Sequence, residues 1–294
     1  MEEPKADRSW VVGVDGSPNS LAALRWALIN GAGRADRIVA VAAWQHTQGD
    51  PDPPTPVVER TMQHRLELQE LLVAVGADER AVAVSRFGSP VDALLEVSRS
   101  GDLIVVGSRE RGRVRRTLAG SVSHECAVRA RVPVVVVPPT LRPFSPIERI
   151  VVGFDGSANA RQALAWTLDF SGPDAEVVVV VATGSRRSGR AFQRGTGTVT
   201  PDFEAMVGEI SGEAGPAGRV RLAVEATEPI AALATHSRTA SLLVLGARGK
   251  GAVAAALLGS VSSRYVSKPP CPLALVPALL QPSGRHTRGD DQIL

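Results

Sequence analysis

The stretch WVVGVDGS at residues 10–17 decides the fold, because it returns as IVVGFDGS at residues 150–157. Each copy is a short apolar strand that ends in Asp-Gly-Ser, with the serine placed to begin a helix. Two later segments also recur: GSVS at residues 120–123 returns at 259–262, and VPVVVV at 132–137 returns as CPLALV at 271–276. The offset is 140 residues for the first pair and 139 for the others, so the chain is a duplication with one indel between its copies.

Strands and helices alternate within each copy. In the first copy, apolar runs predict strands at residues 10–14, 38–43, 81–85, 103–106 and 134–137, with helices at 17–31, 61–75, from 89 and at 121–129. The second copy predicts strands at 150–154, 177–182, 219–224, 242–245 and 273–276, with a helix at 158–169. Unbroken apolar strands that alternate with helices indicate a parallel sheet covered on both faces.

We therefore expect an α/β fold of two tandem doubly wound domains, each a five-stranded parallel sheet flanked by helices. Domain 1 should occupy residues 1–140 and domain 2 residues 141–294, with a proline-rich linker at about 138–146 and a disordered C-terminal tail from about 278. Stretches at 46–56 and 184–200 interrupt the pattern after the second strand of each copy. They are interpreted either as loops that close over a ligand or as plain surface loops.

Composition narrows the function classes. The 294 residues suit two domains, and 44% of them are hydrophobic. Cys126 and Cys271 form neither a disulfide framework nor a metal-ligand spacing. The polar start of the chain has no secretory signal pattern and no apolar run approaches a membrane span, so we expect a cytoplasmic protein with no membrane partner. A net charge of +3 with 4% aromatic residues argues against nucleic-acid binding.

A ligand site is predicted beyond the carboxyl ends of the strands, at the point where the strand order reverses. In a flavodoxin-like order of 2-1-3-4-5, or a relative of it, that point lies beside the first strand, which ends at Asp15 in copy one and Asp155 in copy two. A carboxylate there can accept hydrogen bonds from a ribose or an adenine amine. It can equally form an Asx turn that leads into the next helix, and the sequence leaves both interpretations open.

Glycines follow the fourth strand of the second copy. The segment GARGKG occupies residues 246–251, and nine residues after Gly249 come Gly259 and Ser260, which open a predicted helix. Glycines let backbone N–H groups approach phosphate oxygens, and a helix N-terminus adds N–H donors and a favourable dipole. Either element alone is best interpreted as a flexible turn or an ordinary helix cap. Together, behind a strand and repeated in the other copy, they indicate an anion site.

The spacing Gly246-x-x-Gly249, nine residues, Gly259-Ser260 resembles the ATP-binding signature of the universal stress protein family, in its tandem-domain actinobacterial form. The resemblance covers about residues 9–138 and 148–277. It implies an adenine nucleotide alpha hydrolase-like fold and ATP as ligand, with Mg²⁺ as a candidate companion ion and no protein metal site. It places these second-copy residues around the nucleotide: Gly153, Asp155 and Ala182 at the adenosine end, and Gly246, Arg248, Gly249, Lys250, Gly251, Gly259, Ser260 and Val261 at the ribose and phosphates.

The first copy departs from this signature at Glu110, which stands where the family has glycine. Its matching residues are Gly13, Asp15, Ala43, Gly107, Arg109, Gly112, Gly120, Ser121 and Val122. A carboxylate near a triphosphate repels it, whereas five arginines between residues 109 and 116 either offset that charge or form a solvated face. We expect the first site to be weaker than the second.

No catalytic set is visible in the sequence. The five histidines do not recur between the copies, and Gly249-Lys250-Gly251 lacks the hydroxyl of a Walker A loop. We therefore expect a non-enzymatic ATP-binding protein with a regulatory or stress-response role. The alternatives are a protein-interaction scaffold with vestigial nucleotide pockets, a slow ATP hydrolase, and an ATP-pyrophosphate ligase, although the last requires a Ser-Gly-Gly-x-Asp-Ser loop that is missing here.

The last strand of each copy, at residues 134–137 and 273–276, is apolar and would lie at a sheet edge. Exposed edges of this kind invite pairing. In the family that the chain resembles, such strands pair around a two-fold axis. We therefore expect the two copies to pair within one chain and a homodimer as a second level of assembly. The expected partners are an adenine nucleotide and an unidentified protein.

Overall fold

The computed structural model describes residues 8–46, 56–99, 102–108, 122–139, 144–184, 199–212, 219–248 and 258–278. The first copy contains β1 (Ser9–Gly13), α1 (Pro18–Asn30), β2 (Arg37–Trp44), α2 (Val57–Ala74), β3 (Ala81–Phe87), α3 (Pro90–Val97), β4 (Leu103–Gly107), α4 (Val122–Arg129) and β5 (Val134–Val137). The second contains β6 (Arg149–Gly153), α5 (Ala158–Phe170), β7 (Glu176–Ala182), α6 (Val199–Ser211), β8 (Val220–Glu225), α7 (Pro229–Ser237), β9 (Leu242–Gly246), α8 (Ser260–Ser267) and β10 (Leu273–Val276).

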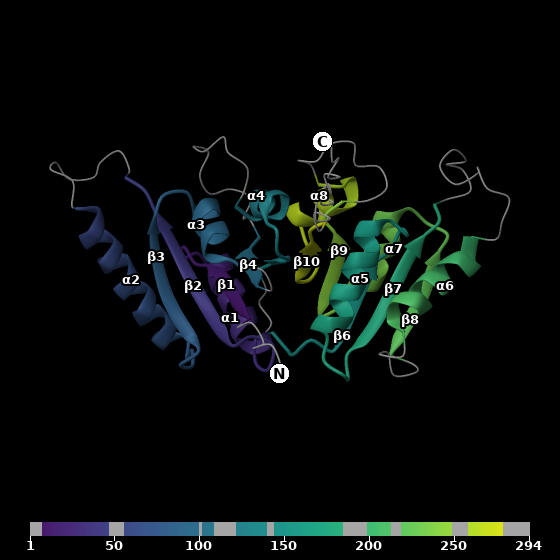
Figure 1. Ribbon diagram of the computed structural model, residues 1–294, viewed down its shortest axis with the longest axis horizontal. Coiled ribbons are helices and arrows are strands. Elements are labelled where there is room, and N and C mark those ends of the chain that lie inside the picture. The colour runs from purple at the N-terminus through teal and green to yellow at the C-terminus, as the bar shows by residue number, and fades with distance from the viewer. Residues whose placement is uncertain are drawn as a thin grey trace, which may run out of the picture.

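All ten strands belong to one continuous sheet, in the order β3-β2-β1-β4-β5-β10-β9-β6-β7-β8 (Figure 1). Within each copy neighbouring strands are parallel, which confirms the doubly wound α/β prediction. The order within a copy is 3-2-1-4-5 rather than 2-1-3-4-5, because the chain takes two steps outward, to β2 and then β3, before it returns across β1 to β4. The reversal still lies beside the first strand, as the sequence predicted.

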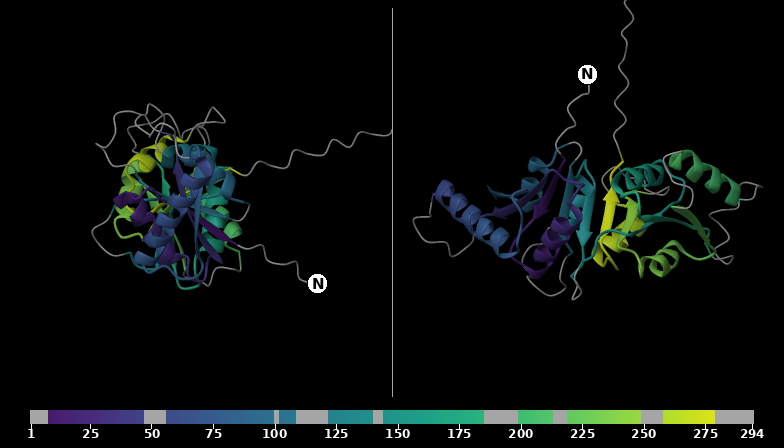
Figure 2. Two further views of the ribbon diagram at one scale, coloured as in Figure 1. Left: turned by 90° about the vertical axis from the view of Figure 1, so that its left-hand side faces the viewer. Right: turned by 90° about the horizontal axis from the view of Figure 1, so that it is seen from below.

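The two copies join through their last strands. Strand β5 pairs with β10 in the antiparallel sense, with Val134 opposite Leu275 and Val136 opposite Leu273. The central pair is Val135 with Ala274, which are equivalent residues under the repeat offset of 139. A pseudo-two-fold axis therefore passes through that pair, and the two halves lie side by side about it (Figure 2). The predicted intrachain pairing of the copies is confirmed.

Two apolar cores lie on the two faces of the sheet. Helices α1, α2, α5 and α6 cover one face and α3, α4, α7 and α8 cover the other, and successive strand residues alternate between them. Leu24 and Leu164, for example, occupy equivalent positions in α1 and α5 and are completely buried in the same core. Each such side chain contributes about 1.5–3 kcal/mol on burial, and both cores run across the junction of the copies.

Local signals set most of the helix starts. Ser17 caps α1 by accepting a hydrogen bond from the Ser20 N–H at 3.2 Å, and Ser157 does the same for α5 with the Ala160 N–H at 3.2 Å.

Some predicted boundaries differ from the structure. Helix α2 begins at Val57 rather than residue 61. The sequence left α6 and α7 unplaced, and the first two residues of α6 fall in the stretch interpreted as a loop at 184–200. The boundary at residue 140 and the tail beyond 278 lie outside the described residues.

Candidate functional site

The strand order creates one switch point in each copy, between β1 and β4 and between β6 and β9. The described candidate residues lie at the carboxyl ends of these strands and of their neighbours β2 and β7, or at the starts of α4 and α8. They are Gly13, Asp15, Ala43, Gly107 and Val122 in the first copy, and Gly153, Asp155, Ala182, Gly246, Arg248, Gly259, Ser260 and Val261 in the second. The remaining candidates lie outside the described residues: Arg109, Gly112, Gly120, Ser121, Gly249, Lys250 and Gly251.

The two aspartates form the turns that the sequence offered as one of two interpretations. One carboxylate oxygen of Asp15 accepts the Ser17 N–H at 3.0 Å, and one of Asp155 accepts the Ser157 N–H at 2.9 Å. The glycine between the aspartate and the serine of each turn has a positive φ, 77° at Gly16 and 74° at Gly156. L side chains rarely adopt this backbone conformation. Each turn thus holds its carboxylate at the end of the first strand, where a ligand would pass.

Asp15 is held in its ionised form. Desolvation acts to raise the pKa of Asp15, but hydrogen bonds from the Ser17 and Ser20 hydroxyls and from backbone N–H groups outweigh it and lower the pKa below its ordinary value. The side chain therefore carries a full negative charge at neutral pH. Such a group accepts hydrogen bonds from hydroxyl and amine donors and repels phosphate, which suits it to a sugar or base rather than to a triphosphate.

An asparagine in each copy ties the first helix to the loop after the fourth strand. Asn19 Nδ2 donates to the Ser108 carbonyl at 2.5 Å, and Asn159 Nδ2 donates to the Arg248 carbonyl at 3.1 Å. Both asparagines are buried, and their Oδ1 atoms have no hydrogen-bond partner among the described residues. The sequence analysis missed this pair, although its recurrence at an offset of 140 residues was a usable signal.

The end of β9 leaves no room for a side chain. A Cβ added at Gly246 would lie 3.0 Å from Asn159 Nδ2 and 3.1 Å from the Arg248 carbonyl oxygen. The space is tighter in the first copy, where a Cβ at Gly107 would lie 2.5 Å from the Asn19 carbonyl oxygen. Glycine at these positions therefore allows close packing of helix against strand.

Helix α8 is anchored directly behind this strand end. The Gly259 N–H donates to the Ala247 carbonyl at 2.9 Å, and the buried Ser262 hydroxyl donates to the Gly246 carbonyl at 2.7 Å. Gly259 is the N-cap residue, and no side chain caps the helix. The start of α8 therefore presents backbone N–H groups at the switch point, at the positive end of the helix dipole.

The copies differ in how the asparagine holds the loop. Ser108 aligns with Ala247 under the offset of 139, so Asn159 reaches one residue farther along its loop than Asn19 does. Glu110 lies outside the described residues, and its predicted effect on the first site stays a prediction. Among the described residues, the two loops differ in which carbonyl accepts from the asparagine, that of Ser108 or that of Arg248.

Metal and membrane chemistry find no support in the described residues. No group of three or more His, Cys, Asp or Glu side chains is placed to hold a metal ion in these parts of the chain. None of the described helices is both long and apolar enough to cross a bilayer. The arrangement offers instead two carboxylates and two helix starts at paired strand ends, a geometry suited to a polar ligand with an anionic end.

Comparisons with known proteins agree with this architecture. A family model described as "Universal stress protein family" matches residues 8–138 and again 146–277. The chain is 30% identical over 287 residues to universal stress protein Rv2005c of Mycobacterium tuberculosis, which covers 90% of this chain and 95% of that protein. It is 29% identical over 304 residues to Rv1996 of the same organism, covering 93% of this chain and 96% of that protein.

A solved structure supports the fold. The crystal structure of a universal stress protein from Archaeoglobus fulgidus is 24% identical, has a TM-score of 0.66, and covers 91% of this chain and 97% of that chain. The fold is thus adenine nucleotide alpha hydrolase-like, as predicted. Because the family model matches twice and the mycobacterial relatives align over nearly the whole chain, the protein belongs to the universal stress protein family.

Proposed function

We propose that the protein binds ATP at the switch point of its second copy and acts as a nucleotide-responsive regulator in the stress response. The observation that carries the proposal is the uncapped start of α8, fixed behind the end of β9 by the Gly259–Ala247 and Ser262–Gly246 hydrogen bonds. Backbone N–H groups at a helix start bind phosphate without any basic side chain.

The remaining candidates supply the other end of the nucleotide. Asp155 stands at the end of β6, the central strand of its copy, where its second carboxylate oxygen can accept from ribose hydroxyls. Ala182 ends β7, the neighbouring strand, and is half-buried, so that a flat base can lie against it. The order adenine, ribose, phosphate then runs from β7 across β6 to α8.

The first copy is proposed as the weaker site. Its framework repeats the second copy, with Asp15 in the same turn and Gly107 packed closely against Asn19, the equivalent of Asn159. What differs is the loop after the fourth strand, where the sequence places Glu110. A carboxylate within about 5 Å of a phosphate charge costs about 3 kcal/mol at an effective dielectric constant of about 20. Such a cost lowers affinity more than a hundredfold.

We further propose that the bound ATP is held and not turned over. Hydrolysis needs a residue that positions water in line with the γ-phosphate and a cation that neutralises the developing charge. Among the described residues at the second switch point, the side chains are Asp155, the hydroxyls of Ser157, Ser260 and Ser262, and Arg248. The Gly249-Lys250-Gly251 segment also lacks the hydroxyl with which a Walker A loop holds magnesium.

The proposal is tested by mass spectrometry of small molecules released from the purified protein, followed by calorimetric titration of the stripped protein with ATP. We expect ATP or ADP in the extract and about one high-affinity equivalent per chain. A phosphate-release assay on the same sample should show no turnover above the protein-free rate. The absence of both bound nucleotide and binding heat would contradict the proposal and favour a scaffold with vestigial pockets.

A further inference from the structure

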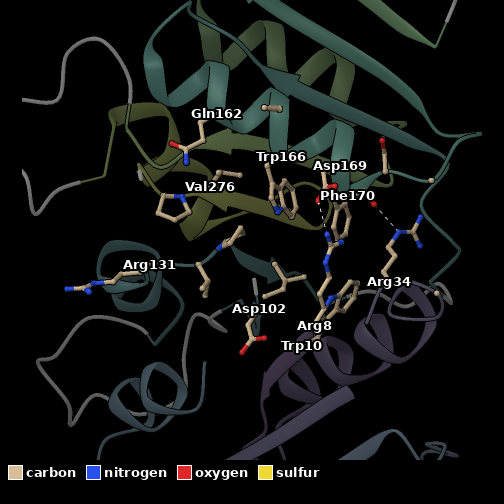
Figure 3. Close-up of a pocket in the computed structure, with 18 of the residues that line it drawn as sticks. Arg8, Trp10, Arg34, Asp102, Arg131, Gln162, Trp166, Asp169, Phe170 and Val276 are labelled. Atoms are coloured by element: carbon tan, nitrogen blue, oxygen red, sulfur yellow. Dashed lines mark hydrogen bonds and ion pairs between the residues drawn. The ribbon is translucent and has the colours of Figure 1, made fainter. Parts of the chain in front are cut away.

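We propose that a cavity between the two copies binds a flat aromatic anion, at a site separate from both switch points. The cavity measures about 750 Å³ and opens where the amino ends of β1 and β4 meet α5 (Figure 3). Residues from both copies line it, among them Arg8, Trp10, Arg34, Trp166, Phe170 and Pro277. It lies at the opposite end of the first copy's strands from Asp15 and Gly107. In the second copy it lies toward the carboxyl ends of the strands, because Val276 and Pro277 line it and β10 is antiparallel to β5. The test therefore keeps the nucleotide sites filled.

A ladder of aromatic rings forms one wall of this interdomain cavity. Trp26 stacks on Trp10 with ring centres 5.5 Å apart, Trp10 stacks on Phe170 at 5.8 Å, and Phe170 stacks on Trp166 at 4.5 Å. The interplanar angles are 17°, 21° and 19°, so each ring is stacked on the next at a small tilt. Trp10 and Trp26 are buried, whereas Phe170 and Trp166 are only partly covered. A flat ligand can therefore extend the stack at its Trp166 end.

The charged groups around the ladder favour an anion. Arg8 pairs with Asp169 at 3.4 Å, and the Asp102 carboxylate is occupied by the backbone N–H groups of Ser9 and Arg99. Arg34 lies over the Phe170 ring, and its guanidinium donates only to carbonyl oxygens, of Phe170 and Asn30.

Two cationic groups are thus left without a counter-charge. Neither Arg34 nor Arg131 has a carboxylate partner among the residues that the structure describes. They lie at opposite ends of the cavity, with Arg131 at its outer rim (Figure 3). An aromatic ligand with a carboxylate or sulfonate would place its ring on Trp166 and its charge near one of these guanidiniums.

The copies differ at residues that line this cavity. The equivalent of Trp166 is Trp26, which is 1% exposed, and the equivalent of Phe170 is Asn30. In the second copy, the segment before β6 packs Phe144 and Ile147 against the core. The offset of 140 aligns these two positions with Pro4 and Asp7 before β1, where the sequence has no large apolar side chain.

The volume and position suit a small molecule. Ligand sites commonly measure about 300–1,000 Å³ and occur at domain interfaces, with an apolar wall and a few polar groups. The chain itself offers a competing occupant, because Pro277 lines the cavity and the sequence continues with Leu279 and Leu280. The test must therefore separate a free ligand from this tail.

The test uses 8-anilinonaphthalene-1-sulfonate, an aromatic sulfonate whose flat naphthalene ring can stack, titrated calorimetrically into the full chain with saturating ATP present. We expect one saturable site per chain. Ala165→Trp, which fills the exposed side of the cavity, should abolish binding, whereas Trp166→Ala and Arg34→Gln should each weaken it about tenfold. Arg25→Trp is the matched control, because Arg25 is the exposed equivalent of Ala165 in α1 and does not line the cavity; it should bind as the wild type does.

Three results would overturn the proposal. The first is equal affinity in the wild type and Ala165→Trp, with melting temperature and circular dichroism unchanged in the variant. The second is dye binding that is seen in nucleotide-free protein and lost at saturating ATP, which would assign the dye to a switch point. The third is binding that appears only in a chain ending at Ala278, which would show that residues 279–294 occupy the cavity in place of a ligand.

Discussion

Replacing Gly259 by aspartate should stabilise the second copy while it removes nucleotide binding there. Gly259 is the N-cap of α8 with φ −60° and ψ 155°, a backbone conformation open to any L residue, and it has no capping side chain. Aspartate is among the best N-cap residues and also interacts favourably with the helix dipole. The stability gain should be about 0.5–1 kcal/mol, or about 1–3 °C in melting temperature for a chain of this size.

The same carboxylate would stand where we place a phosphate. At a separation of about 4–5 Å and an effective dielectric constant of about 20, each pair of unit negative charges costs about 3–4 kcal/mol. ATP affinity in the second copy should therefore fall by about 100- to 1,000-fold. Gly259→Asp should raise stability and lower ATP affinity, because the capping carboxylate and the phosphate would use the same N–H groups.

The assay is calorimetric titration with ATP beside thermal melting of the nucleotide-free protein. Gly259→Asn is the matched control, since it supplies a neutral cap of the same size and should keep affinity within about tenfold of the wild type. Gly120→Asp makes the equivalent change in the first copy and should leave the high-affinity site intact. Wild-type ATP affinity in Gly259→Asp, or an equal loss in Gly259→Asn, would refute the placement of phosphate charge at the start of α8.

Three further predictions follow from other parts of the fold. Asn159→Ala should remove the tie to the loop after β9, lower the melting temperature by about 2–4 °C and weaken ATP binding; Asn19→Ala should destabilise similarly in melting experiments and leave the high-affinity site unchanged. Burial raises the pKa of the Cys126 and Cys271 thiols to about 12 from an ordinary 9.0, so both should resist a thiol reagent at pH 8 until urea is added. Because the pKa values are raised in the folded state, the two protonated thiols contribute fully to the free energy of unfolding below pH 9, and this contribution is lost toward pH 12. Denaturant titrations across that pH range measure the loss. Ala274→Lys should place a charge at the centre of the β5–β10 pairing and separate the unfolding of the two copies in calorimetry.

The sequence predicted the fold well because its strongest signals are local and repeated. WVVGVDGS and IVVGFDGS give the first strand, the turn and the helix cap in each copy, and every one of the ten strands fell within about two residues of its predicted position. Strand order was harder to predict. The sequence of an apolar strand that is buried on both faces does not indicate which strands pair with it. Helices α6 and α7 were left unplaced, although Pro229 stands at the first position of α7 as Pro90 does in α3, which was predicted.

The candidate site was predictable only where its chemistry is carried by neighbouring residues. The Asp-Gly-Ser turn and the Gly259 helix start are contiguous motifs, and the structure has them as turn and cap. The Asn159–Arg248 hydrogen bond joins residues 89 positions apart, so no window of sequence contains it. Its only trace in the sequence is the matching asparagine at position 19.

Comparison of the two copies is the means by which such long-range features can be found. Residues that recur at the repeat offset, such as Asn19 and Asn159, hold the common framework, whereas residues that differ mark where one copy has acquired its own chemistry. Phe170 replaces the equivalent of a buried asparagine, and its ring joins tryptophans from both copies into one stack. A symmetric pair of domains would bury the same side chains on both sides of its axis. Residues that line the interdomain cavity therefore differ from their equivalents in the other copy, and a ligand there would contact both copies at once.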